Sequence, residues 1–288
     1  MPAPHSPILI AVDIGNSRIK LGRFDGETNP ANHSALPQPS DTIELPIDFR
    51  NGQFDEKRLS QWASKNAPGN CLWSMASVHH AAAGQFTSTI SYVTTQRAAN
   101  WQIRRLTFTD VDMPIHVTEP SRVGIDRLLA AFAADRLRRP DRVAVVVDLG
   151  SAITVDLVDK KGGFAGGAIL PGIAMSARAL SEQTDALPHV TFESFDHKPT
   201  PIGKSTVAAI ESGLVWGTVG AIRELIRNYS LGEESSPDVF LTGGASPRIA
   251  ELLAAESASE VSREPGHIQH VESMVLSGIA LVHGSMRQ

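Results

Sequence analysis

ILIAVDIGNSRIKLGRFD at residues 8–25 returns in similar form at residues 143–159, which read VAVVVDLGSAITVDLVD. Each copy is a run of β-branched residues that ends in an aspartate, followed by a glycine-containing turn and a second alternating run, a pattern typical of a β-hairpin. Asp13 aligns with Asp148 and Gly15 with Gly150, at a spacing of about half the 288-residue chain. The repeat predicts a duplicated fold with an acidic group at the tip of each half.

Composition narrows the class of protein. A chain of 288 residues, with 42% hydrophobic and 20% charged residues, is ordinary for a globular protein of two domains. The repeat places those domains at 1–140 and 141–288. The net charge of −5 offers no basic surface for nucleic acid. A single cysteine excludes a disulfide framework, and no apolar run has the length of a membrane span. Since no basic leader precedes the first strand, we expect a cytoplasmic protein.

The first half predicts a mixed sheet covered by helices. IELPID at 43–48 and CLWSMASV at 71–78 are typical of strands, and DEKRLSQWASK at 55–65 has the period of an amphipathic helix. The stretch 25–41 is rich in proline, asparagine and serine and predicts a solvent-exposed insertion. The order of hairpin, strand, helix and strand is typical of an α/β fold.

The second half restarts the same organisation. GGFAGGAIL at 162–170 predicts a strand, the following Pro171-Gly172 opens a helix, and a long helix begins near Thr206. DVFLTGGASPRIAELLA at 238–254 predicts a strand, a glycine turn and a helix. The bare backbone of that turn suits close packing of a nucleotide base or ribose.

A further helix is predicted at 124–139, GIDRLLAAFAADRLRR, which has one apolar stripe and is followed by Pro140. Asp126 and Arg127 lie in its first turn. An aspartate there is also typical of a plain favourable interaction with the helix dipole, so its position alone does not assign it a function.

The two hairpins carry residue types that suit phosphate and Mg²⁺. The aspartate can hold hydrated Mg²⁺, the glycine lets phosphate approach the backbone, and Asn16, Ser17 or Ser151 can donate to phosphate oxygens. Lys20 adds a positive charge in the first copy, and the alignment places Val155 at that position in the second. If Asp13, Asp126 and Asp148 converge, each like-charge pair about 4 Å apart costs roughly 4 kcal/mol, which calls for a cation or a proton.

Other motifs do not support a site. IGKST at 202–206 resembles the end of a P-loop, but Lys198 stands at the required first glycine and prolines interrupt the loop. His267 with His270, and His79 with His80, have no matching set of cysteine or acidic ligands for zinc.

Six motifs, in this order, resemble the signature of type III pantothenate kinases: D-I-G-N-S-R-I-K at 13–20, G-I-D-R at 124–127, D-L-G-S-A-I-T-V-D at 148–156, G-G-A-I-L-P-G at 166–172, G-K-S-T at 203–206 and T-G-G at 242–244. The resemblance implies the actin-like, sugar kinase and Hsp70 superfamily fold. In that α/β fold, two ribonuclease-H-like domains each have a mixed β-sheet flanked by helices, with ATP in the cleft between them. It also implies a homodimer that uses ATP to phosphorylate pantothenate to 4'-phosphopantothenate, the first step of coenzyme A biosynthesis. Mg²⁺ accompanies ATP, and a monovalent cation, K⁺ or NH₄⁺, activates the enzyme.

The resemblance also implies roles for individual residues. Asp126 matches the general base that accepts the proton of the substrate hydroxyl, and Asp148 matches the aspartate that binds the monovalent cation. Thr206 matches a threonine that reaches substrate in the partner subunit. Pantothenate binding falls to Gly124, Ile125, Asp126 and Arg127. The resemblance implies that Asp13 contacts Mg²⁺ through ATP. The residues that it implies for phosphate or ATP binding are Asp13, Gly15, Asn16, Ser17, Lys20, Gly150, Ser151, Gly243 and Gly244.

Two alternatives stay open at this point. The same fold could phosphorylate a sugar or another small alcohol, again with Asp126 as base. The chain could instead be a non-catalytic nucleotide-binding regulator, but such a protein has no need for the candidate base, so its presence favours catalysis.

Overall fold

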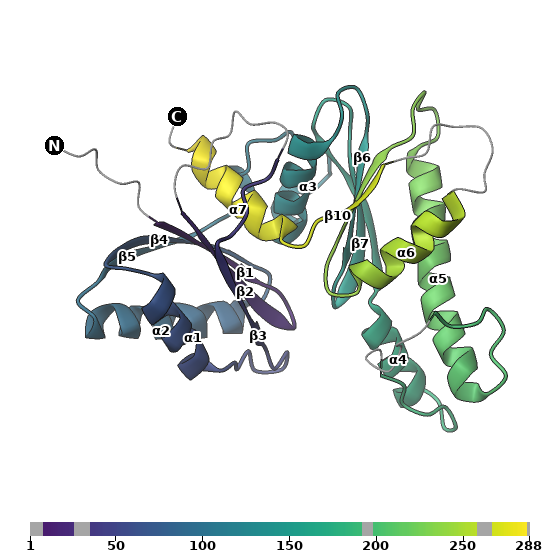
Figure 1. Ribbon diagram of the computed structural model, residues 1–288, viewed down its shortest axis with the longest axis horizontal. Coiled ribbons are helices and arrows are strands. Elements are labelled where there is room, and N and C mark those ends of the chain that lie inside the picture. Colours follow the sequence, from purple (N-terminus) through teal and green to yellow (C-terminus); the bar gives the residue numbers. More distant parts are fainter. Residues whose placement is uncertain (1–7, 26–34, 192–197, 258–266, 287–288) are drawn as a thin grey trace. The chain divides into compact units, whose positions relative to one another are not determined.

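The computed structural model describes residues 8–25, 35–191, 198–257 and 267–286. The chain forms two compact units (Figure 1). The N-terminal unit comprises Met1–Leu137 and Ser273–Gln288, and the C-terminal unit comprises Arg138–Glu272. The boundary lies near the predicted residue 140, but the end of the chain returns to the N-terminal unit instead of staying with the second domain.

The N-terminal unit contains a five-stranded sheet in the order β3-β2-β1-β4-β5. β1 pairs antiparallel with β2, and β2 with β3, whereas β4 and β5 run parallel to β1. The strands are β1 (Ile8–Ile14), β2 (Arg18–Phe24), β3 (Asp41–Pro46), β4 (Asn70–Ser77) and β5 (Asn100–Arg105).

The C-terminal unit repeats this arrangement, with the order β8-β7-β6-β9-β10 and the same strand directions. Its strands are β6 (Ala144–Leu149), β7 (Ala152–Val158), β8 (Phe164–Pro171), β9 (Asp238–Thr242) and β10 (Ile268–His270). The shared topology confirms the duplicated α/β fold that the repeat predicts, because each repeated segment is the central hairpin of its sheet.

Helices cover the sheets as the sequence predicts, with additions. In the N-terminal unit they are α1 (Glu56–Asn66), α2 (His80–Gln96), α3 (Ile125–Leu137) and α7 (Met274–Ser285), with short 3₁₀ turns at Phe108–Asp110 and Pro120–Arg122. In the C-terminal unit they are α4 (Ile173–Glu182), α5 (Thr206–Tyr229) and α6 (Ser246–Ser257). The predicted helices at 55–65, 124–139 and from Thr206 are confirmed. None of the described helices combines the length and the apolar character needed to cross a membrane.

The two faces of the N-terminal sheet carry different helices. Ile10, Val12 and Ile14 of β1 enter a core with residues of α1 and α2, while α7 packs on β1, β2 and β4 from the other face. Gly278 of α7 lies against the backbone of Leu129 in α3, where a side chain would not fit. This packing is the physical reason why the C-terminal helix belongs to the N-terminal unit. Because neighbouring strand residues alternate between faces, Asp13 lies on the side of α3 and α7.

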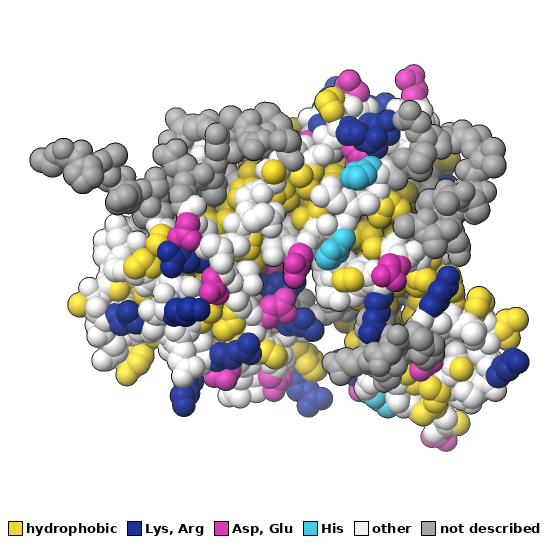
Figure 2. Space-filling view, viewed as in Figure 1, with side chains coloured by type: hydrophobic (Ala, Val, Ile, Leu, Met, Phe, Trp, Pro, Cys, Tyr) yellow, Lys and Arg dark blue, Asp and Glu magenta, His cyan; other side chains and the backbone are white. Residues whose placement is uncertain are grey.

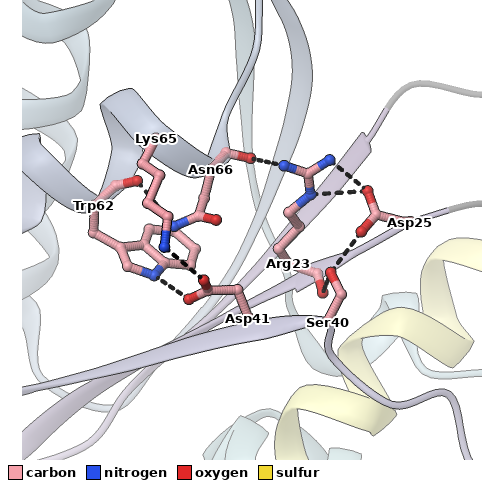
Figure 3. Close-up of polar contacts among 7 residues, drawn as sticks. All are labelled: Arg23, Asp25, Ser40, Asp41, Trp62, Lys65 and Asn66. Carbon is pink, nitrogen blue, oxygen red and sulfur yellow. Dashed lines mark hydrogen bonds and ion pairs between the residues drawn. The ribbon is translucent and has the colours of Figure 1, made fainter.

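Polar contacts join β2 and β3 to α1 (Figure 3). Nε1 of Trp62 donates to Asp41 at 2.8 Å, and Nη1 of Arg23 donates to the carbonyl of Asn66 at 3.2 Å. Arg23 also binds Asp25 and keeps the pKa of that carboxyl below its ordinary value.

Residues 26–34 of the predicted exposed insertion at 25–41 lie outside the described residues. In the described part the prediction of solvent exposure is wrong for Leu36, which is buried, and the carbonyl of Pro37 accepts from Oγ of Ser277 in α7 at 2.8 Å.

A buried ion pair fixes the start of the C-terminal unit. The carboxylate of Asp238, only 1% exposed, accepts from the backbone N–H of Arg139 at 2.7 Å and from its Nε at 2.8 Å. Nη2 of Arg139 contacts the same carboxylate. A buried charge that loses its partner is strongly destabilising, whereas an exposed pair contributes little.

We therefore expect Arg139→Met to lower the free energy of unfolding by about 3 kcal/mol, because it leaves the buried carboxylate of Asp238 without its charged partner. Lys65→Met is the matched control, since Lys65 is 77% exposed in its ion pair with Asp41 and should cost less than about 1 kcal/mol. Urea unfolding measures both. Equal losses for the two variants would contradict the assigned role of the buried pair.

Candidate active site

The first hairpin places charges side by side on one row of the N-terminal sheet. Asp13 of β1 lies directly opposite Lys20 of β2, and Lys20 lies opposite Glu44 of β3. Nζ of Lys20 is 4.0 Å from Glu44, which also pairs with Arg18 at 2.9 Å. Residues directly opposite each other share a face, so Lys20 stands in this row between the acidic residues Asp13 and Glu44. The sequence alone does not indicate that Glu44 belongs to this row, because its place depends on the pairing of β3 with β2.

The tip of this hairpin is held by backbone bonds and leaves polar groups exposed. The N–H of Gly15 donates to the carbonyl of Arg18 at 3.0 Å, and the N–H of Ile47 donates to the carbonyl of Ser17 at 2.9 Å. The side chains of Asn16 and Ser17 face solvent. A Cβ added at Gly15 would come no closer than 3.5 Å to the rest of the chain. The fold itself therefore has no steric need for glycine there, and the space beside it is open to a ligand.

The second hairpin differs in its turn and so in its register. Asp148 of β6 lies opposite Thr154 of β7, because this turn is one residue shorter than the first. The sequence alignment, which places Val155 at the position of Lys20, is wrong after the turn. Val155 is fully buried in the core of the C-terminal unit, and Thr154 is the counterpart of Lys20.

The T-G-G turn after β9 closes on Asp148. Thr242 lies opposite Asp148 on the other side, and Gly243 has a φ of +91°. A Cβ at Gly243 would lie 2.5 Å from Oδ1 of Asp148 and 2.6 Å from the backbone of Leu149. Glycine is required there for two reasons, the positive φ and the close approach. Gly244, next in the turn, is exposed.

The tip of the second hairpin packs on the strand end that precedes α4. The N–H of Gly172 donates to the carbonyl of Ser151 at 3.2 Å, and a side chain at Gly172 would collide with the backbone of Gly150 and Ser151. The Pro171-Gly172 punctuation in the sequence therefore reflects a close approach that fixes Ser151.

Asp126 lies in the first turn of α3, as predicted, and its carboxyl is partly buried. Burial raises the pKa of Asp126 above its ordinary value, opposed by a hydrogen bond from the N–H of Arg127 at 2.9 Å and by the Arg127 charge. A Cβ at Gly124 would lie 2.5 Å from Oδ1 of Asp126. The glycine of G-I-D-R thus leaves room for the carboxyl, and Ile125 anchors the segment in the core.

The structure brings the Asp126 segment close to the first hairpin. The N–H of Val78, which follows β4, donates to the carbonyl of Ile14 at the end of β1 at 3.0 Å. The same Val78 side chain lies 3.7 Å from a Cβ built on Gly124. Asp13 also faces the side on which α3 packs. The hairpin with Asp13 and Lys20 and the helix start with Asp126 therefore share one edge of the N-terminal sheet.

Thr206 begins α5, and the loop before it is tightly fixed. Ser205 caps the helix by accepting from the N–H of Ala208 at 3.2 Å. Oγ of Ser212 donates to the carbonyl of Pro201 at 2.8 Å, and Nε1 of Trp216 donates to that of Pro199 at 3.0 Å. Thr206 belongs, with Asp148, Ser151 and the T-G-G turn, to the C-terminal unit.

The donor groups fit ATP-bound Mg²⁺ better than a protein-only metal centre. Within the described residues no three His, Cys, Asp or Glu side chains cluster to hold a metal. Mg²⁺ in nucleotide sites usually takes one or two carboxylates, with phosphates and waters as its other ligands. Asp13, at the edge of an open hairpin tip, offers one carboxylate for that purpose.

Comparison with known proteins decides between the alternatives. The family model for type III pantothenate kinase matches residues 9–228. The chain belongs to the type III pantothenate kinase family. A type III pantothenate kinase of Anaeromyxobacter sp. strain K is 30% identical over 285 residues, covering 96% of this chain and 98% of that protein. One from Rhodopirellula baltica is 42% identical over 157 residues, which span 54% of this chain and 55%, about half, of the relative.

Family membership confirms the predicted function. The chain is a kinase that phosphorylates pantothenate with ATP and a divalent metal in coenzyme A biosynthesis.

Among solved structures, the ethanolamine utilization protein EutJ from Carboxydothermus hydrogenoformans aligns over 98% of this chain and 92% of its own, with 16% identity and a TM-score of 0.49. An archaeal actin homologue, Ta0583, aligns over 97% of this chain with 13% identity and a TM-score of 0.43.

The two hairpin-contacting glycines should respond differently to substitution. We expect Gly15→Ala to change the free energy of unfolding by less than about 1 kcal/mol, because the added methyl has space, while raising the KM for ATP. Gly243→Ala should cost about 1–3 kcal/mol or more, since alanine is strained at positive φ and collides with Leu149. Thermal unfolding and ATP kinetics check both. A stable Gly243→Ala enzyme would contradict the close packing at Asp148.

Proposed function

We propose that Asp126 is the general base that takes the proton from the pantothenate hydroxyl as the γ-phosphate of ATP is transferred. The observation that carries the proposal is a carboxyl with a raised pKa, at a helix start, on the same sheet edge as a phosphate-type hairpin. A raised pKa makes the ionised carboxylate a stronger base, and a fixed position supplies the orientation that phosphoryl transfer mainly needs.

The other residues then have complementary roles. Asp13 meets Mg²⁺ through ATP, and Gly15, Asn16, Ser17 and Lys20 receive phosphate at the first hairpin. Gly150, Ser151, Gly243 and Gly244 bind ATP in the C-terminal unit. Gly124, Ile125 and Arg127 hold pantothenate beside Asp126, and Thr206 contacts it from the partner subunit. Mg²⁺ supplies charge neutralisation on the phosphates, and Lys20 adds a fixed positive charge.

Asp126→Asn tests the base. Asparagine keeps the shape and can still accept from the N–H of Arg127, so we expect kcat to fall about 10²- to 10⁴-fold. In the parent enzyme, burial favours the uncharged form of Asp126. The free energy of unfolding of the parent therefore falls as the pH rises from the pKa of Asp126 in the unfolded chain to its higher pKa in the folded protein. Above that window the variant should be at least as stable as the parent.

Asp135→Asn, later in the same helix, is the matched control and should stay active. In the parent, kcat/KM should fall as the pH drops through a pKa above 3.8, the ordinary value for aspartate, because only the ionised carboxylate accepts a proton. Full turnover by a folded Asp126→Asn enzyme would remove Asp126 from the role of base.

We further propose that Asp148 binds the activating monovalent cation, K⁺ or NH₄⁺. Its surroundings fit a hard cation. The carboxylate lies between Thr154 and Thr242 on its sheet row, and the Gly243 backbone approaches it without a side chain in between. Carboxylate, hydroxyl and carbonyl oxygens are the ligands such ions prefer.

A homodimer through α5 is the third part of the proposal. Hydrophobic side chains gather over α4 and the neighbouring end of α5 (Figure 2). Ile202 is 78% exposed and Met175 47% exposed. On α5, Gly213, Gly217 and Gly220 share one face, and a Cβ on any of them would meet nothing within 4 Å. A hollow of about 180 Å³ lies beside the first two, floored by Ile153 and Leu170.

That surface suits a second copy of the chain. The glycine face of α5 beside an apolar hollow allows two helices to pack closely, and exposed apolar surface of this kind typically marks an interaction site. We expect the binding partners to be small molecules and a second copy of the chain, with no nucleic acid or membrane. We expect the enzyme to work in the cytoplasm.

Gly217→Glu tests the dimer surface. The new side chain has space in the single chain, so folding should be unaffected, but its charge would be buried against the second copy. We expect sedimentation equilibrium to show a monomer. Gly84→Glu, a helical glycine with equally open surroundings on α2, is the control and should leave the dimer intact. A dimeric Gly217→Glu protein would refute this surface.

A further inference from the structure

The duplicated fold places two different residues beside its two hairpin aspartates. Asp13 has the lysine Lys20 directly opposite, whereas Asp148 has the threonine Thr154. Both pairs occupy the same position in sheets of identical strand order. The sequence hides this equivalence because the second turn lacks one residue, which moves the alignment onto the buried Val155.

The face of the sheet on which Thr154 lies supports its equivalence to Lys20. Val155 lies in the core beneath α5 with 0% exposure, so Thr154 must face the other side, with Asp148. From β9, Thr242 flanks the same carboxylate. The two immediate cross-strand neighbours of Asp148 thus bring hydroxyl groups and no charge, whereas the positively charged residue Lys20 lies directly opposite Asp13 in its row.

An aspartate at a phosphate site needs a compensating positive charge, because like charges close together are costly. In the first hairpin the chain supplies that charge covalently, through Lys20. In the second hairpin it supplies oxygen atoms of the kind that coordinate a hard monovalent cation.

We propose that Thr154 and Thr242 complete the monovalent-cation site of Asp148, and that the bound cation supplies the positive charge that Lys20, at the equivalent register position, supplies in the other half of the fold. The inference rests on the proposed cation role of Asp148 and adds two binding residues to it.

Thr154→Lys is the decisive variant, because it rebuilds the lysine of the first hairpin in the second. We expect it to give equal rates in potassium and in tetramethylammonium chloride at matched ionic strength, whereas the parent is slower in the organic cation. A second readout does not depend on catalysis. Potassium should raise the melting temperature of the parent by binding to the folded state, and should give the Thr154→Lys protein no more stabilisation than tetramethylammonium does.

Two further variants make the test specific. Thr154→Val removes only the hydroxyl and should raise the potassium concentration at half-maximal stabilisation about tenfold or more, the usual cost of losing one partner of a charged group. Thr95→Lys adds the same charge at an exposed position on α2 and should keep the parental response. A folded Thr154→Lys enzyme that still needs potassium would overturn the inference, as would an unchanged potassium midpoint in Thr154→Val or a lost response in Thr95→Lys.

Asp148→Asn separates this inference from the proposal beneath it. If the parent ignores potassium, or if Asp148→Asn keeps the potassium response, the cation role of Asp148 fails and the inference fails with it. If Asp148→Asn loses the response while both Thr154 variants keep it unaltered, the aspartate binds the cation and only the role of Thr154 is wrong.

Discussion

The register of the two antiparallel hairpins is the constraint on which the rest of the site depends. A strand that slips by one residue turns every side chain to the other face. The buried runs of β1 and β6 prevent such a slip, because Val12 and Val147 must enter their cores. Asp13 and Asp148 are thereby forced onto the opposite faces, and their neighbours across the strands follow from the turn length. One residue in a turn decides whether a lysine or a threonine stands beside the aspartate.

The proposed general base lies in a segment outside the repeat. α3 begins at a glycine that leaves space for the Asp126 carboxyl, and burial raises the pKa of that group while the N–H of Arg127 moderates the effect. The segment reaches the first hairpin through Val78, which bonds to the end of β1. Duplication therefore provides two phosphate-type hairpins, and α3, which lies between them in the sequence, carries the proposed base. This division explains why neither copy of the repeat, taken alone, looks like a complete active site.

Much of this could be predicted from the sequence, and the limits have physical reasons. The hairpins, α1, α3 and α5 follow from strong local patterns. The helix pattern places Asp126 in the first turn of α3, but only the resemblance of G-I-D-R to the family signature indicates the role of base, because an aspartate there also suits the helix dipole. The equivalence of Thr154 to Lys20 was missed because a fixed alignment spacing cannot detect a shorter turn. The return of α7 to the N-terminal unit was missed because it depends on the fit of Gly278 against Leu129, a contact between distant residues. The required glycine at 243 and the sterically free glycine at 15 look alike in sequence, since only tertiary neighbours distinguish them.

A structure of the enzyme with pantothenate and a non-hydrolysable ATP analogue would show whether Asp126 is the base. We expect the reacting hydroxyl of pantothenate to lie within about 2.6–3.2 Å of a carboxylate oxygen of Asp126 and in line with the γ-phosphate. A bound substrate whose hydroxyl lies beyond hydrogen-bond reach of Asp126, with another carboxylate beside it, would remove Asp126 from the role of base.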